Sequence, residues 1–407
     1  MRRLPVWPDV VRVNPALASL FSSRAARVTL VMSALFAASG VIMVFFPRWL
    51  EGERGLTGAE IGAILALAQF GRVITGPLIA MWADAAPDKY APLRIMSLAT
   101  LGAYGVFFFV ADGFWGLLAL GFIALTLSQA MTPLVEAATL QATAQGRFGY
   151  GFARGVGSIA FICANVAGGA LVARFGLDAV IAWVLASMLA LNCATWFGLP
   201  KEPRPTPATV RHGAAMGDLL RRRRYLILIV SCGLIQSAHG FYYGFSTLVW
   251  RGQGVPPDMV GLLWAFGVAV EVAFLWSLSP IERRISPETL IVWGAAGGVL
   301  RWAVLGFAPL GFVLWPLQAL HTLSFAAAHV GAMRLLSREF ADNGAAMAQM
   351  LYAVLSGGVL MGASTLLSGY LYDLVGAQGY WAMAVIALFG GGLALLLRAP
   401  TRSATPR

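Results

Sequence analysis

Long apolar runs separated by short polar segments make up most of this chain. An α-helix of about 20 residues crosses the ~30 Å of hydrocarbon in a lipid bilayer. Runs of that length recur at 26–46, 60–82, 94–112, 115–139, 152–174, 177–199, 225–249, 259–281, 289–308, 312–336, 345–369 and 380–397. The pattern predicts an all-α membrane protein with twelve transmembrane helices.

The largest polar interval lies between the sixth and seventh runs. It reads "GLPKEPRPTPATVRHGAAMGDLLRRRRY", and its prolines and terminal arginines are typical of a linker with a charge anchor at the inner membrane face. It separates six predicted helices from six. We therefore expect a cytoplasmic leader at 1–25, a six-helix bundle at 26–199, a cytoplasmic linker at 200–224, a second six-helix bundle at 225–397 and a cytoplasmic tail at 398–407.

The two halves share a short internal similarity. The stretch "GLTGAEIGAILALAQFGRVITGP" superposes without a gap on "GVPPDMVGLLWAFGVAVEVAFLW". In each stretch a loop enters a helix at a glycine, Gly62 or Gly261, and an intramembrane charge follows, Arg72 or Glu271. Two pseudo-symmetric bundles of this kind are typical of a large class of transporters.

The composition favours a membrane protein, because 59% of the 407 residues are hydrophobic and only 12% are charged. The formal net charge of +11 could indicate a nucleic-acid partner. However, most Lys and Arg residues fall in alternate loops and near the two ends, whereas the other loops hold only Arg48, Arg54, Arg174 and Arg251. Such an asymmetry predicts that both termini are cytoplasmic, and we expect no nucleic-acid partner.

The sequence offers no sign of an enzyme. No nucleophile stands beside a base, no metal-ligand cluster occurs and no nucleotide-binding loop is present. The three cysteines have no motif spacing, so no disulfide or metal site is predicted. We expect no cofactor. A non-transporting sensor would need an appended soluble domain, for which the polar segments are too short.

Among the charges within the predicted spans, five are candidates for a functional role: Arg72, Glu136, Arg154, Glu271 and Arg301. A charge at the centre of a bilayer costs at least ~2.5–3.5 kcal/mol, so such residues face a bundle interior or a wet cavity and have partners. Arg72 and Glu271 are interpreted either as an ion pair between the halves or as groups that bind substrate or protons. Glu136 and Arg154 follow one another on consecutive helices, which favours pairing, or they cap helix ends near the cytoplasm.

The seventh run carries a polar stripe at helical spacing, formed by Gln236, His239, Tyr243 and Ser246. It fits the wall of a wet cavity, or else hydrogen bonding between helices. In the tenth run, His321 could carry a proton beside Arg301, since histidine titrates near neutral pH.

Several segments resemble the lactose permease branch of the major facilitator superfamily. "TPLVEAATL", "YGFARGVGS", "VEVAFLWSLSPIERR", "GGVLRWAVLG" and "LQALHTLS" match its fourth-, fifth-, eighth-, ninth- and tenth-helix segments. The resemblance implies functional positions for Glu136, Arg154, Glu271, Arg301 and His321. Two differences exclude the same proton route as in lactose permease. This chain has Ser324 where lactose permease has a tenth-helix glutamate, and Gln318 where it has a lysine.

The chain is more similar still to the 3-phenylpropionic acid transporters, a subgroup of that branch. The shared sequence segments include "QSAHGFYYGFSTLVW", "GLLWAFGVAVEV" and "RWAVLGF". This resemblance implies a proton-driven symporter in a bacterial inner membrane. The loop segment "GPLIAMWADAAPDKYAPLR" keeps the superfamily's acidic gating residue as Asp84, without the usual glycine and basic residue around it.

The resulting hypothesis is uptake of an aromatic carboxylate, such as 3-phenylpropionate, together with protons. Three intramembrane arginines against two glutamates leave a net positive charge that suits a monoanion. We expect the substrate site to include Arg72, Arg154, Gln236, His239, Tyr242 and Tyr243, and proton coupling to involve Glu271 with Arg301, His321 and Glu136. The alternative is a proton-coupled sugar or nucleoside symporter. A monomer is the simplest expectation, although the sequence leaves the oligomeric state open.

Overall fold

The computed structural model describes residues 23–144, 149–203, 213–278, 284–340 and 345–398. Within these ranges the chain is almost entirely helical, and its only β-type pairing is an isolated bridge between Asp88 and Pro203. Nearly all of the predicted leader and tail, and the middle of the predicted linker, lie outside the described residues.

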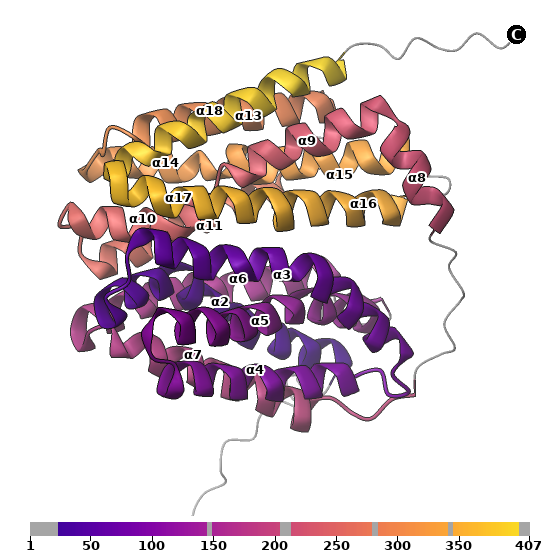
Figure 1. Ribbon diagram of the computed structural model, residues 1–407. Coiled ribbons are helices and arrows are strands. Elements are labelled where there is room, and N and C mark those ends of the chain that lie inside the picture. The colour runs from indigo at the N-terminus through magenta and orange to yellow at the C-terminus, as the bar shows by residue number, and fades with distance from the viewer. Residues whose placement is uncertain (1–22, 145–148, 204–212, 279–283, 341–344, 399–407) are drawn as a thin grey trace, which may run out of the picture.

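The N-terminal half is a helix bundle drawn in indigo to magenta in Figure 1. Local capping sets several helix ends: the Thr57 hydroxyl accepts from the Glu60 amide while Glu60 reaches back, and Gly55 ends the preceding helix at φ 66°. The helices are α2 (Arg24–Arg54), α3 (Gly58–Ala85), α4 (Ala91–Val110), α5 (Gly113–Thr143), α6 (Tyr150–Phe175) and α7 (Asp178–Cys193), the last continued by a π segment, Ala194–Gly198.

The C-terminal half forms a second bundle, drawn in pink to yellow, and α8 lies at one end of the molecule (Figure 1). Its helices are α8 (Gly213–Arg221), α9 (Arg223–Ser237), α10 (Gly240–Gly252), α11 (Pro257–Trp276), α13 (Pro287–Leu305), α14 (Leu314–Ala319), α15 (Ala328–Glu339), α16 (Ala345–Ala353), α17 (Met361–Val375) and α18 (Gly379–Leu395). Two π segments, Thr322–Ala327 and Val354–Leu360, interrupt the runs from α14 to α15 and from α16 to α17.

The described residues contain ten helical stretches that are long and apolar enough to cross a membrane. The predicted run 312–336 is not among them; it consists of a 3-10 turn, α14, a π segment and the start of α15. One stretch, Met347–Arg398, has 52 residues. A straight helix of that length would measure about 78 Å, more than twice the hydrocarbon thickness, so it holds more than one crossing. The fold is a multi-pass membrane bundle, and the number twelve remains a prediction.

The two halves touch most closely where glycines let helix backbones approach. A Cβ atom added at Gly62 in α3 would lie 3.0 Å from the Cα atom of Gly369 in α17. A Cβ atom added at Gly169 in α6 would lie 3.3 Å from the Cα atom of Gly261 in α11. Gly62 and Gly261 are the equivalent positions of the internal sequence similarity, so both copies of the repeat place a small residue at the contact between the halves.

A polar network, which we call the latch, joins the halves at one end and consists of Glu51, Arg251, Tyr372 and Asp373. Arg251 Nη1 donates to Glu51 Oε2 at 2.7 Å, and Tyr372 Oη donates to Glu51 Oε1 at 3.2 Å. The two Asp373 carboxylate oxygens accept from the first two amides of α3, each at 2.7 Å. Because α2 starts beside the linker and ends near Glu51, the latch lies at the end opposite the linker.

We expect Asp373→Asn to loosen this end of the molecule. A carboxylate at a helix N-terminus contributes typically 0.3–1 kcal/mol, so its loss shifts the balance between closed and open forms by roughly 2- to 5-fold. Spin labels on the exposed positions Glu53 and Pro256 would report a larger share of long distances in Asp373→Asn.

Asp112→Asn is the matched control for this experiment. Asp112 precedes α5, is exposed, and makes no side-chain capping bond there. Its substitution should leave the distance distribution between the spin labels unchanged. An equal shift in both variants would show that the latch carboxylate does not hold the halves together.

Candidate functional site

A buried polar cluster lies inside the C-terminal half and is centred on Arg301 of α13, which is fully buried. Its Nη1 donates to His321 Nδ1 at 3.0 Å, and its Nη2 donates to Gln318 Oε1 at 3.1 Å. The guanidinium carbon lies 4.3 Å from the centre of the Tyr242 ring and 4.6 Å from that of Trp302. Hydrogen bonds and two aromatic faces thus replace the water that the charge would otherwise need.

These contacts fix the proton position on His321. A guanidinium can only donate, so Nδ1 of His321 accepts and its other ring nitrogen, Nε2, carries the hydrogen in the neutral form. Nε2 lies 3.4 Å from Oε2 of Glu271 in α11. The Glu271 side chain is 18% exposed, whereas that of His321 is 9% exposed. Glu271, His321 and Arg301 contact one another in that order. Water therefore reaches this row of side chains more easily at Glu271 than at His321.

His239 and Tyr242 extend the same cluster. Nδ1 of His239 lies 3.0 Å from the Gln236 carbonyl, and its Nε2 lies 3.2 Å from Oγ of Ser324. Since the carbonyl only accepts, the hydrogen of neutral His239 is on Nδ1 and Ser324 donates to Nε2. The Tyr242 hydroxyl donates to Gln318 Oε1 at 2.7 Å.

The backbone is irregular where this cluster forms. His239 lies in the turn between α9 and α10, and His321 directly precedes the π segment that contains Ser324. π segments insert an extra residue and occur frequently at functional sites. The predicted stripe on the seventh run is therefore divided: Gln236 and His239 face the interior of the C-terminal half, whereas Tyr243 reaches the space between the halves.

A half-exposed ion pair links α5 and α6 in the N-terminal half. Arg154 Nε lies 3.6 Å from Glu136 Oε1, and both side chains are 38% exposed. Arg154 also donates to Ser158 Oγ at 3.0 Å and lies over the Phe36 ring. The pairing suggested by the sequence is present, in a setting where water screens it.

A central cavity of about 280 Å³ lies between the halves. Helices α2, α3, α4, α5 and α6 line it from one side, and α10 and α17 from the other. Its polar lining is provided by Ser39, Gln69, Arg72, Tyr104, Ser128, Gln129, Thr132, Tyr243 and Thr365. The remaining lining is mainly apolar, which suits a ligand with a ring and a few polar atoms.

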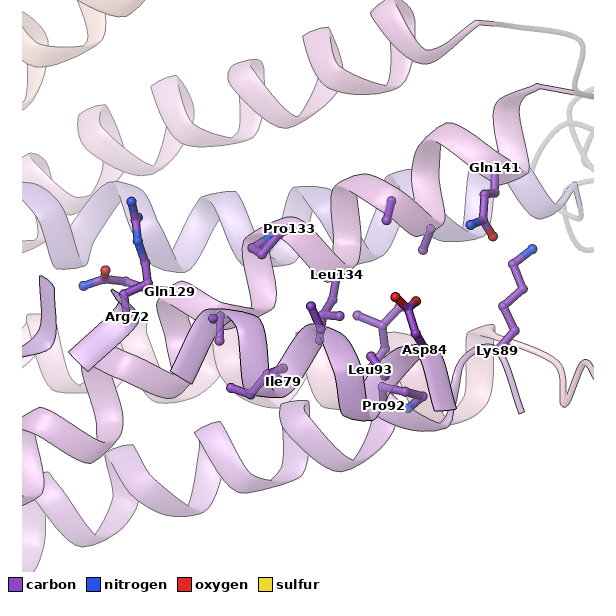
Figure 2. A pocket seen from close by; sticks show the side chains of 16 residues that line it. Arg72, Ile79, Asp84, Lys89, Pro92, Leu93, Gln129, Pro133, Leu134 and Gln141 are labelled. Atoms are coloured by element: carbon purple, nitrogen blue, oxygen red, sulfur yellow. The ribbon is translucent and has the colours of Figure 1, made fainter. Parts of the chain in front are cut away.

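A second cavity of about 260 Å³ lies within the N-terminal half, between α3, α5 and the start of α4. Figure 2 shows Arg72 and Gln129 at one end of it and Asp84, Lys89 and Gln141 at the other. Arg72 and Gln129 line both cavities. The cavity between the halves is called the central cavity, and the one within the N-terminal half is called the inner cavity.

Arg72 is the charge at the junction of the two cavities. Among the residues that the structure describes, no carboxylate lies within ion-pair distance of its guanidinium. The guanidinium packs so closely on Gly357 that a side chain there would collide with it. The ion pair between Arg72 and Glu271 considered from the sequence is therefore not formed, because Glu271 points to His321 inside the other half.

The structure also locates the remaining expected residue and adds others. Asp84, expected in a gating loop, lies in the last turn of α3 and lines the inner cavity. The neighbouring Asp88 ties the loop to the linker, since it contacts Arg94 and accepts from the Glu202 amide at 3.1 Å. Sequence reasoning missed Gln69 as a lining residue, although it lies three residues before Arg72 on the same helix.

We expect Arg301→Lys to destabilise the protein much more than Arg154→Lys. Lysine lacks the planar fork whose two terminal nitrogens donate separately to His321 and Gln318, and changing one partner of a buried charge network costs ~2–4 kcal/mol. The same change at the half-exposed Arg154 should cost less than ~1 kcal/mol. Thermal unfolding in detergent, followed by circular dichroism, measures both. Equal effects would show that the Arg301 contacts contribute nothing beyond a charge.

Comparisons with known proteins agree with this architecture. The family described as "MFS_1 like family" matches residues 27–383. A probable 3-phenylpropionic acid transporter of Escherichia coli (strain K12) is 30% identical over 359 residues, which are 87% of this chain and 92% of that protein. A maltose permease of Geobacillus stearothermophilus is 24% identical over 371 residues, 90% of this chain and 92% of the permease.

Solved structures share the fold at low sequence identity. The nucleoside transporter NupG superposes with a TM-score of 0.76 at 14% identity, over 93% of this chain and 100% of its own. A bacterial homologue of the human lysosomal transporter Spinster has a TM-score of 0.71 at 14% identity, over 92% of this chain and 96% of its own. Together, the family match along most of the chain and the shared fold establish that this protein belongs to the MFS_1-like family of major facilitator transporters.

Proposed function

We propose that this transporter carries an aromatic monocarboxylate, such as 3-phenylpropionate, together with a proton. The proposal rests on Arg72. This cation lies on the wall of the central cavity, and no described residue supplies a carboxylate to pair with it. Of the three intramembrane arginines, Arg301 is held by the buried cluster and Arg154 is paired with Glu136. Arg72 is left to bind an incoming anion.

The surroundings of Arg72 complete a site for such a ligand. A guanidinium binds a carboxylate through two parallel hydrogen bonds. Gln129 lies beside Arg72 on the wall of both cavities, and its side-chain NH2 group is of the kind that can donate to a carboxylate. Phe161, Tyr243 and Met361 line the same cavity and supply apolar or aromatic surface for a ring. The name of the Escherichia coli relative points to the same class of ligand.

Proton coupling is assigned to Glu271. It is the most exposed end of the row that continues through His321 to Arg301. With a proton on Glu271, its attraction to the His321 N–H weakens, and the packing of α11 against the π segment that follows His321 can change. Glu136, which is half-exposed and paired with Arg154, is the second carboxylate able to respond to substrate. Reorientation of the two halves about the central cavity would then move both solutes.

The alternative substrate is a neutral sugar or nucleoside. It is supported by the similarity to a maltose permease and by the fold shared with a nucleoside transporter. A neutral substrate would give the free charge of Arg72 no counterpart, which is why the carboxylate is preferred.

We expect Glu271→Gln to separate exchange from accumulation. The protein, reconstituted in liposomes that contain a pH-sensitive dye, should acidify them when 3-phenylpropionate is added, but not when maltose or a nucleoside is added. Glu271→Gln should lose this acidification and all pH-driven accumulation, while it still exchanges labelled for unlabelled 3-phenylpropionate. Protein-free liposomes correct for diffusion of the protonated acid. Full accumulation by Glu271→Gln would assign the proton to another group.

We expect Arg72→Gln to raise the KM for 3-phenylpropionate by about 10- to 100-fold. Hydrogen bonds to a charged group contribute ~1.5–3 kcal/mol, which corresponds to that range. The neutral analogue 3-phenylpropionamide serves as a matched control, because its weak transport should be the same in wild type and Arg72→Gln. Arg72→Lys should fall between the two. An unchanged KM for the carboxylate in Arg72→Gln would remove Arg72 from the site.

A further inference from the structure

The inner cavity combines features that the central site does not use. It shares Arg72 and Gln129 with the central cavity, extends along α3 and α5, and ends at Lys89 and Gln141 beside the linker. Between its ends the lining is apolar, with Ile79, Leu93, Leu134 and several alanines. A passage with cations at both ends and an apolar wall between them suits a ligand with a carboxylate and a ring.

The length of the inner cavity separates its two ends into different sites. At a rise of 1.5 Å per residue, the α-helical backbone from Arg72 to Asp84 extends about 18 Å. A phenylpropionate ion is much shorter than this, so it cannot contact Arg72 and Lys89 together. A ligand at the Lys89 end therefore does not occupy the central cavity at the same time.

Lys89 is held toward this position by its neighbours. Its backbone amide donates to the Glu202 carbonyl at 2.8 Å, and its ammonium lies 5.1 Å from the centre of the Tyr90 ring. The ammonium is 4.0 Å from Glu202 Oε1, at the limit of an ion pair, and the side chain is only 14% exposed. Figure 2 shows the ammonium and the Gln141 amide on the same side of the cavity end.

We infer that the inner cavity is a second, weaker anion-binding station, at which Lys89 and Gln141 hold the carboxylate between the central site and the linker side. This inference rests on the proposed function, since it assigns a further site to the same class of substrate. Two carboxylates lie near the Lys89 ammonium, Asp84 in the cavity lining and Glu202 at 4.0 Å, so its attraction for an anion is largely offset. A station from which the anion must leave again should bind it only weakly.

The station predicts a difference between the two faces of the membrane. Lys89→Gln should raise the KM for 3-phenylpropionate presented on the linker side by about 3- to 5-fold, because a partly exposed charge pair contributes up to ~1 kcal/mol. The KM for substrate presented on the opposite side should not change. Proteoliposomes of known orientation, assayed for exchange from each face at low and high salt, measure this, and high salt should reduce the difference.

Three further variants test whether the charge of Lys89 and the open passage cause this difference. Lys89→Arg keeps the charge and should behave as wild type. Lys201→Gln removes an exposed lysine from the same region and should have no effect. Ala137→Phe, at an exposed residue that lines the inner cavity, should slow exchange from the linker side by filling the passage, even if Lys89→Gln folds poorly.

The outcomes distinguish this inference from the proposed function. If wild type does not transport 3-phenylpropionate, the proposed function fails and the station fails with it. If wild type transports it and Arg72→Gln impairs both faces, but Lys89→Gln and Ala137→Phe match wild type on both, the proposed function stands and the station is overturned. Equal changes on both faces in Lys89→Gln would likewise overturn the station, because they indicate a general effect on folding or turnover.

Discussion

The free energy cost of a charge in hydrocarbon is the constraint on which the rest of this structure depends. Each intramembrane charge needs hydrogen bonds, an opposite charge or water. Arg301 is fully enclosed. It donates to His321 and Gln318 and lies against two aromatic rings, while its Nε has no hydrogen-bond partner among the described residues. Arg154 is half-exposed to water and paired with the Glu136 carboxylate. Arg72 lies where two cavities meet and has only their contents as a possible counterion. The three arginines thus differ in their access to water: Arg301 is enclosed, Arg154 is half-exposed, and Arg72 lines two cavities.

The charges proposed for binding and for proton coupling lie in different halves. Arg72 belongs to the N-terminal bundle, whereas Glu271, His321 and Arg301 belong to the C-terminal bundle. The halves are joined by glycine crossings and by the latch, and Arg72 itself packs on Gly357 of the opposite half. A carboxylate on Arg72 would therefore bind at the contact between the halves, next to the π segment of α16 and α17. Binding there can influence how the halves meet without a direct contact to the proton site.

The sequence predicted the class of fold because apolar runs of membrane-spanning length are an unambiguous signal. It also located the charged residues, since any charge stands out in such runs. It could not predict their partners. Arg72 and Glu271 are equivalent in the repeat and opposite in charge, yet the direction of each side chain is set by packing that only the folded bundle defines. Gln318 was noticed only as a departure from lactose permease, although it joins Tyr242 to Arg301. The π segments had no periodic signature, because their residues are as apolar as those of the helices around them.

The distribution of charge also bears on the energy source. With both histidines taken as neutral, as the hydrogen bond from Arg301 indicates for His321, the three arginines and two glutamates named above give one net positive charge. One monoanion on Arg72 and one proton on Glu271 leave this charge unchanged. The empty and the loaded carrier would then cross the membrane field with equal charge, so the membrane potential would favour neither step. In a one-to-one symporter of this design, the pH difference rather than the membrane potential supplies the driving force for accumulation.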